Sequence, residues 1–166
     1  MGQQQLLLLV LGIVIVGIAI VVGINAYSEN SIKSNFDALL QDALRMASDA
    51  QSWKQKPEVF GGSPDATKND AGDFTGLDYT QMAYSQDLVS ASRLCYSNTN
   101  GQFNLTSVTA DSVVIQGENV SNQNRVRVSV DGVLEANVEL LEATSIRGGA
   151  LLSTGAATTV APTACT

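Results

Sequence analysis

The sequence lacks the residues and spacings that usually mark a catalytic site. There is no His, so the usual general base and the commonest metal ligand are both missing. Ser and Asp are plentiful, but no Ser-x-x-Lys or Gly-x-Ser-x-Gly spacing marks a serine as an activated nucleophile. We therefore expect no catalytic residue, no cofactor and no enzymatic activity.

Four carboxylates gather in one segment, at Asp65, Asp70, Asp73 and Asp78. Carboxylate oxygens are ligands that Ca2+ prefers, but the spacing of these four matches no calcium-binding loop. A solvated acidic loop is the simpler interpretation, and we predict no metal site.

Two features would matter in an exported chain. Without a C-x-x-C spacing, Cys95 and Cys165 indicate neither a redox motif nor a zinc site. They favour one disulfide, with two unpaired buried thiols as the alternative.

The triplets Asn104-Leu105-Thr106 and Asn119-Val120-Ser121 match the N-glycosylation pattern, which also arises by chance.

Charge is distributed unevenly along the chain. The first 28 residues carry no charged side chain, and the remainder gives the chain its net charge of -7. An acidic protein repels phosphate backbones, so we expect no non-specific binding to nucleic acid.

Residues 6–24 form an apolar run that only Gly12, Gly17 and Gly23 interrupt. As a helix that rises ~1.5 Å per residue, this run is long enough to cross a bilayer core of ~30 Å. Signal peptides and signal anchors normally carry Lys or Arg before the apolar stretch, but residues 1–5 include neither. We therefore expect a chain produced by a cut that removed a basic leader.

An amphipathic pattern follows the apolar run directly. Its apolar residues recur mostly at spacings of three and four with charged residues between them, which is typical of a helix with one buried face. Pro57 and the pair Gly61-Gly62 mark its end. We predict one near-continuous helix from Gln4 to Lys54, weakened at the three glycines. The apolar stripe consists of Ile32, Phe36, Leu39, Leu40, Ala43, Met46, Ala47, Ala50 and Trp53.

The rest of the chain carries β-strand signals after an irregular connector at residues 57–80. The stretch from Tyr79 to Val89 is ambiguous between helix and strand. Alternating apolar residues in the later strands leave one apolar sheet face, which the stripe would cover. Turn signals at 100–101, 110–111 and 131–132 separate expected strands at 103–109, 112–117, 125–130 and 133–141, and the tail is expected to add an edge strand that ends near Cys165.

The expected fold class is α+β, with a long N-terminal helix packed against an antiparallel β-sheet. Its parts would be the apolar half of the helix (1–25), the amphipathic half (26–56) and a C-terminal globular β domain (57–166). On the exposed sheet face, Arg125 and Arg127 are expected to form cross-strand ion pairs with Glu135 and Glu139.

This organisation resembles the type IV pilins. Met1 resembles the residue that prepilin peptidase exposes when it cuts after a leader glycine, and the run from Leu6 resembles the pilin membrane segment. The cysteine pair, with Cys165 close to the C-terminus, resembles the pair that closes the C-terminal region of many bacterial pilins. The resemblance in sequence covers the long helix, and the rest matches in architecture alone.

The first residues depart from the pilin pattern. Gln5 stands where pilins typically carry a glutamate that neutralises the terminal amine of a neighbouring subunit, and Gln cannot neutralise a buried ammonium. Either Gln3, Gln4 and Gln5 solvate the amine together, or the amine faces a wet channel. Alternatively, Gly2 ends a very short leader and the mature chain begins at Gln3. Many archaeal pilins also lack the glutamate, so a bacterial and an archaeal source both stay open.

The resemblance implies a structural subunit of an extracellular type IV pilus-like filament on the cell surface, anchored in the cytoplasmic membrane before assembly. Its partners would be copies of itself, the pilus assembly machinery and prepilin peptidase. The alternatives are a pseudopilin or minor pilin of a secretion or DNA-uptake machine, and a non-polymerising single-pass anchored binding domain. The residues expected in the filament core are Met1, Gln5, Leu6, Leu7, Leu8, Leu9, Val10, Leu11, Ile13, Val14, Ile15, Val16, Ile18 and Ile20.

Overall fold

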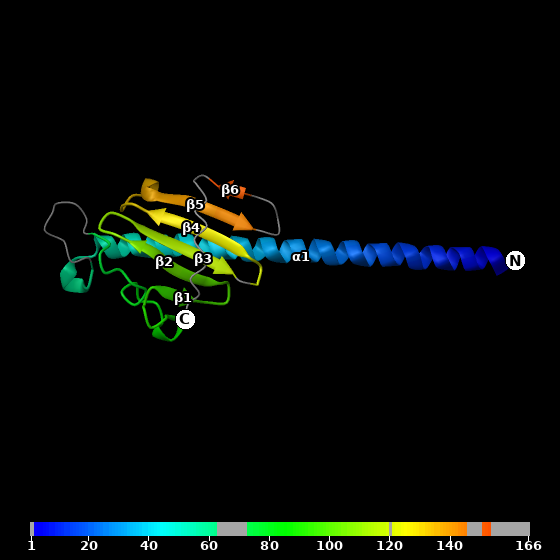
Figure 1. Ribbon diagram of the computed structural model, residues 1–166, viewed down its shortest axis with the longest axis horizontal. Helices are drawn as coiled ribbons and strands as arrows, with labels where there is room; N and C mark the ends of the chain where they lie inside the picture. The colour runs from blue at the N-terminus through cyan, green and yellow to red at the C-terminus, as the bar shows by residue number, and fades with distance from the viewer. Residues whose placement is uncertain (1, 63–72, 120, 146–150, 154–166) are drawn as a thin grey trace.

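One long helix packed on one antiparallel sheet makes up most of the described part of the chain. A computed structural model describes residues 2–62, 73–119, 121–145 and 151–153. The helix α1 (Gly2–Gln55) packs on the sheet with its C-terminal half, while its N-terminal half protrudes alone along the longest axis of the molecule (Figure 1). The shorter elements are η1 (Glu58–Phe60), η2 (Gln86–Leu88), β1 (Cys95–Ser97), β2 (Gln102–Val108), β3 (Val113–Asn119), β4 (Asn124–Val130), η3 (Glu135–Asn137), β5 (Val138–Ser145) and β6 (Leu151–Ser153).

The helix confirms the prediction of one near-continuous rod. Its 54 residues correspond to a length of ~80 Å at the standard rise. The helical conformation continues through Gly12, Gly17 and Gly23, so the glycines do not interrupt it. It ends at Gln55, two residues before Pro57, as the proline signal predicts.

The six strands among the described residues follow one another in sequence order, and every neighbouring pair is antiparallel. The expected turns at residues 100–101 and 110–111 are confirmed, because they connect β1 to β2 and β2 to β3. β6 forms one edge of the sheet by pairing with β5. The expected end of this strand near Cys165 lies outside the described residues.

The predicted second strand of the last hairpin was wrong at its start. β5 begins at Val138 and not at residue 133. Asn137 closes a longer loop, because its carbonyl accepts a hydrogen bond from Asp131 N at 2.8 Å and its own N–H donates to Leu134 O at 2.9 Å. Leu134, which the alternation placed on the apolar face, is therefore 66% exposed.

The helical stripe covers the apolar sheet face as predicted. Of its nine residues, Phe36 and Leu40 are partly buried against the core and the other seven are buried. Ala43, Ala47 and Ala50 are fully buried, and their small side chains let α1 lie close to the sheet, where it packs mainly on β4 and β3. The buried residues of the helix are Ile32, Leu39, Ala43, Met46, Ala47, Ala50 and Trp53.

Gly117 of β3 lies at a point of close approach. A Cβ atom there would stand 2.8 Å from Cε1 of Phe103 and 3.4 Å from Cγ of Leu39. The first distance is shorter than a carbon–carbon contact allows, so only glycine fits between the ring of β2 and the helix.

The segment before the sheet is irregular but contributes to the core. Residues 73–94 form turns and η2, and the ambiguous stretch from Tyr79 to Val89 is neither an α-helix nor a strand. Phe74, Leu77 and Tyr79 are buried in the same cluster as the helical stripe. Part of the expected connector therefore belongs to the folded domain.

Candidate functional site

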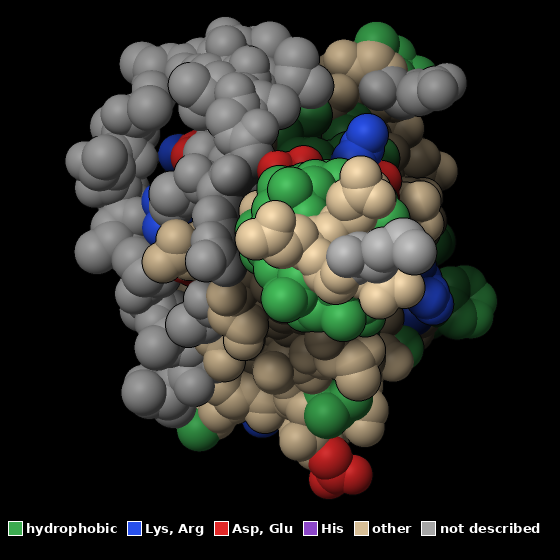
Figure 2. Space-filling model, turned by 90° about the vertical axis from the view of Figure 1, so that its right-hand side faces the viewer, with side chains coloured by type: hydrophobic (Ala, Val, Ile, Leu, Met, Phe, Trp, Pro, Cys, Tyr) green, Lys and Arg blue, Asp and Glu red, His purple; other side chains and the backbone are tan. Residues whose placement is uncertain are grey.

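The largest feature of the molecule that packing leaves unexplained is the N-terminal half of α1. Its large apolar side chains are between 50% (Leu11) and 68% (Leu7) exposed, and none of residues 2–24 is buried. Viewed along the helix, hydrophobic side chains surround the end that faces the viewer (Figure 2). The exposed set consists of Leu6, Leu7, Leu8, Leu9, Val10, Leu11, Ile13, Val14, Ile15, Val16, Ile18, Ile20, Val21, Val22 and Ile24.

This half of α1 has the length and composition of a membrane-spanning helix. An 18-residue window reaches a mean hydropathy of 3.3 with none of its residues buried. Backbone polar groups are satisfied within the helix, so it could anchor the protein in a bilayer. Covering its 15 large side chains, with lipid or with protein, would be favourable by on the order of 20 kcal/mol before association costs.

The residues expected to matter at the helix start are only partly described. Met1 lies outside the described residues. Gln5 is exposed in the first turns of α1, as are Gln3 and Gln4. The first turn has no acidic residue, so nothing in it offsets the partial positive charge of the helix N-terminus.

The folded part of the chain after α1, which we call the head, is tied to α1 by hydrogen bonds just beyond the apolar half. Asn124, at the start of β4, is fully buried, and its Nδ2 donates to Ile32 O and to Asn35 Oδ1, each at 3.0 Å. Its Oδ1 has no hydrogen-bond partner among the described residues. Two turns beyond Asn35 along the helix, Asp42 Oδ2 accepts from Asn98 Nδ2 at 2.9 Å and from Asn100 Nδ2 at 2.8 Å.

A second set of hydrogen bonds holds the other end of the helix. Gln51 Nε2 donates to Gly132 O at 3.0 Å and to Leu134 O at 2.8 Å. Tyr84 Oη donates to Asp49 Oδ2 at 2.7 Å. Because both ends of the amphipathic half are fixed to the sheet domain, the apolar half projects from the head in one direction.

Burial and hydrogen bonding keep the tyrosines next to the helix protonated. Tyr84 packs edge-on against Tyr79 and Tyr96. Burial raises the pKa of Tyr84, and the hydrogen bond to Asp49 raises it further. Burial likewise raises the pKa of Tyr79 well above its usual value. These neutral phenols contribute ring contacts and the hydrogen bond to Asp49 to the packing of the core against the helix.

The expected ion pairs on the exposed sheet face were wrong in their partners. Arg125 Nη2 lies 3.5 Å from Glu118 Oε1, directly across from it on β3. Glu135 is in η3 and Glu139 is opposite Ser129, because the loop closed by Asn137 shifts β5 along the chain. The strand alternation predicted the face correctly but not the register.

The candidate modification sites lie at different places. Asn104 is half-buried within β2. Asn119 Nδ2, the atom that would carry a glycan, donates to Asn100 O at 2.6 Å. Cys95 is buried at the start of β1, and no described cysteine is free. Cys165 lies outside the described residues, so the Cys95–Cys165 disulfide stays a prediction.

The acidic connector gives no metal site within the described part of the chain. Asp73 Oδ1 accepts the N–H of Thr75 at 3.0 Å. Asp78 Oδ1 accepts the N–H of Gln81 at 2.8 Å. These two carboxylates therefore cap turns of their own segment, while Asp65 and Asp70 lie outside the described residues.

The sequence did not predict the polar side chains that tie α1 to the sheet just beyond the apolar half. These are Asn35, Asp42, Asn98, Asn100 and Asn124. Asn in a turn is usually a turn former, and the turn signals were interpreted in that way alone. The signal that could have found them is the concentration of Asn in two turns at the same end of the sheet.

Searches with family models, among curated proteins and among solved structures find no match to this chain.

Proposed function

We propose that this chain is a structural subunit of an extracellular type IV pilus-like filament, which polymerises through the apolar half of α1. The observation that carries the proposal is the combination of an apolar half with no buried residue and a head fixed to the same helix beyond it. A helix that only anchors a domain needs an apolar surface in contact with lipid. Nothing requires such a helix to continue unbroken into the core of the domain. A rigid continuation is useful when the helix must position the head relative to other copies.

Two environments would cover the apolar half in turn. In the membrane, lipid covers the apolar half, and the subunit is stored with its head outside the bilayer. In the filament, the same surface is covered by the helices of other copies, and the head domains form the outer wall. Identical contacts that do not close into a ring generate a helical polymer.

Copies of the same chain, the cytoplasmic membrane, prepilin peptidase and the assembly machinery are the partners that this role requires. It requires no catalytic group, metal or cofactor. Disulfide pairing of Cys95 with Cys165 would stabilise the head outside the cell, where thiols are oxidised.

The proposal is tested on cells that make the protein. Filaments sheared from the surface should contain this chain in large amounts by mass spectrometry and negative-stain microscopy. An Ile15→Asp variant should lose them, because a charge would enter the apolar bundle. A Val59→Asp variant is the matched control, since Val59 is 91% exposed on the head.

Two outcomes would contradict the filament role. If sheared filaments contain only traces of this chain, it serves as a minor pilin or pseudopilin. If the wild-type chain remains in the membrane and no filament contains it, the non-polymerising anchored domain is the better description.

A further inference from the structure

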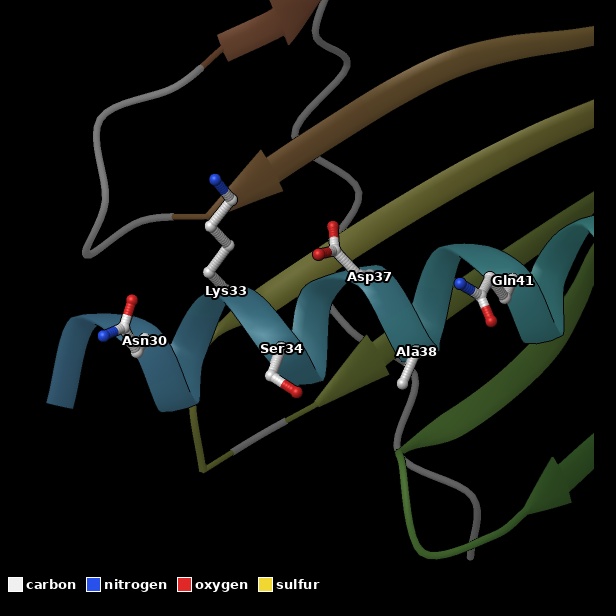
Figure 3. Close-up of a pocket in the computed structure, with 6 residues that line it drawn as sticks. All are labelled: Asn30, Lys33, Ser34, Asp37, Ala38 and Gln41. Atoms are coloured by element: carbon white, nitrogen blue, oxygen red, sulfur yellow. The ribbon is translucent and has the colours of Figure 1, made fainter. Parts of the chain in front are cut away.

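A charged face of α1 lies between the apolar half and the residues that tie the helix to the head. Glu29, Lys33 and Asp37 follow one another at intervals of four, so they line one side of the helix and alternate in sign. All three are exposed. Lys33 and Asp37 extend from the same side of α1 (Figure 3).

These charges have no partner within the described part of the chain. The ion pairs Arg93–Asp78 and Arg125–Glu118 both lie in the part of the chain after α1, and neither involves this face. Glu29 and Lys33 stand in the favourable order for an ion pair along a helix, and Lys33 and Asp37 stand in the less favourable one. Neither pair forms an ion pair in the described part of the chain. The alternating charges are thus available to another molecule.

The same stretch of helix forms a shallow groove. Its lining combines the charged Lys33 and Asp37 with the small side chains of Ser34 and Ala38, bordered by Asn30 and Gln41 (Figure 3). Small residues let a second helix approach closely, while charges beside them fix its position along the axis.

We propose that this face binds the α1 helix of a second copy, parallel and staggered by four residues, with Lys33 of one copy between Glu29 and Asp37 of its neighbours. This inference rests on the proposed filament function and specifies one lateral contact within it. A parallel arrangement follows because an antiparallel one would place the apolar half of one copy beside the head of the other.

Charge complementarity selects the stagger. With no stagger, Lys33 would lie level with Lys33 of the neighbour, and like charges would meet. A stagger of four residues, ~6 Å along the axis, brings Lys33 level with Glu29 and Asp37 level with Lys33. A stagger of eight brings Asp37 level with Glu29, so two carboxylates would meet.

The apolar run sets an independent limit on the same quantity. At a stagger of four, Glu29 lies level with Asn25 of the neighbour, just outside the run. At five or more, Glu29 would lie level with Ile24 or an earlier apolar residue. Burying a carboxylate there without a partner is costly. Four residues is therefore the largest stagger that pairs the charges and keeps them out of the apolar bundle.

Charge reversal in cells that assemble wild-type filaments tests this contact. K33E places acidic side chains opposite each other both where Lys33 meets Glu29 and where Asp37 meets Lys33. We expect the mass of filament to fall by about tenfold or more. The triple variant E29K/K33E/D37K restores opposite signs at every pairing and should recover filaments. K56E is the matched control, because Lys56 is exposed beyond the end of α1 and undergoes the same charge change.

Cross-linking measures the stagger directly. Filaments mixed from differently tagged N30C and S34C copies should yield a disulfide-linked pair of the two tags, because residue 34 of one copy lies level with residue 30 of the next. Filaments of S34C alone should yield far less cross-linked product. Fluorescence of Trp53, which is buried in the head, checks that each variant is folded.

The outcomes separate this inference from the filament function. If K33E forms as much filament as wild type, or if the triple variant does not recover, the proposed contact is wrong while the filament function stands. Efficient cross-linking of S34C alone would mean an unstaggered contact and would also overturn it. If the wild-type chain forms no filament, both proposals fail together.

Discussion

The helix–head junction predicts a sharp difference between two substitutions of one residue. Asn124 is fully buried and donates two hydrogen bonds to groups that can only accept there, Ile32 O and Asn35 Oδ1. Asn124→Asp keeps the size of the side chain but replaces the donor with a carboxylate oxygen. Asn124→Ala removes the side chain and leaves no charge behind.

The magnitudes follow from what each change leaves in the junction. Asn124→Ala loses two hydrogen bonds to the helix but also removes the unpartnered Oδ1, so the loss in free energy of unfolding should be about 1–2 kcal/mol. Asn124→Asp buries an uncompensated charge against two acceptors at 3.0 Å. This change should cost about 3–5 kcal/mol.

The assay is urea unfolding of the full chain in detergent, followed by the fluorescence of Trp53. This residue is the only Trp of the chain and lies in the core between α1 and the sheet, so its signal reports on the head. Asn122→Asp is the control, because Asn122 is in the same turn and its side chain makes no hydrogen bond among the described residues.

The pH dependence supplies a further check. A buried carboxyl is favoured in its neutral form, and a protonated Asp at position 124 could donate one of the two hydrogen bonds. The loss in free energy of unfolding caused by Asn124→Asp should therefore become smaller as the pH falls, whereas the loss caused by Asn124→Ala should not. Equal midpoints for Asn124→Asp, Asn122→Asp and wild type at neutral pH would refute the assigned donor.

Three further predictions concern the head. Gly117→Val should lower the free energy of unfolding by about 1–3 kcal/mol or more in the same assay, since any Cβ there overlaps a buried ring; an unchanged midpoint would contradict the packing. The raised pKa of Tyr84 keeps it protonated in the fold while the unfolded chain ionises above pH ~10, so stability should be constant below that pH and fall above it. The free energy of unfolding of Tyr84→Phe, which also loses the hydrogen bond to Asp49, should fall less steeply above that pH. Unfolding curves measured at several pH values test this, and an identical fall in both proteins would refute the raised pKa. The intact mass of the exported protein should lack two hydrogen atoms relative to its reduced form, as a Cys95–Cys165 disulfide requires; an unchanged mass on reduction would exclude the pairing.

The sequence predicted the helix and its buried face well, because both depend on local periodicity. Spacings of three and four placed Leu39, Ala43 and Trp53 on one side, and the structure buries all three. The exposed apolar half was equally predictable, because a helix that packs on one sheet buries only one of its faces, and this half is apolar on all of its sides.

Contacts between distant segments could not be predicted in the same way. The residue that β5 places opposite Arg125 depends on the loop that Asn137 closes. It is Thr144, whereas the two-residue turn expected at Asp131-Gly132 gave a different register. A hydrogen bond within a loop decides the register, and composition does not reveal it. The same holds for Asn124, whose role depends on which helix carbonyl the fold brings near it.

The most direct measurement of the central claim is a helical reconstruction of filaments sheared from cells that make this protein. We expect residues 6–24 of many copies to bundle at the filament centre, with the head domains outside and adjacent α1 helices parallel. A filament that lacks this chain, or one in which the apolar half of α1 faces solvent, would contradict it.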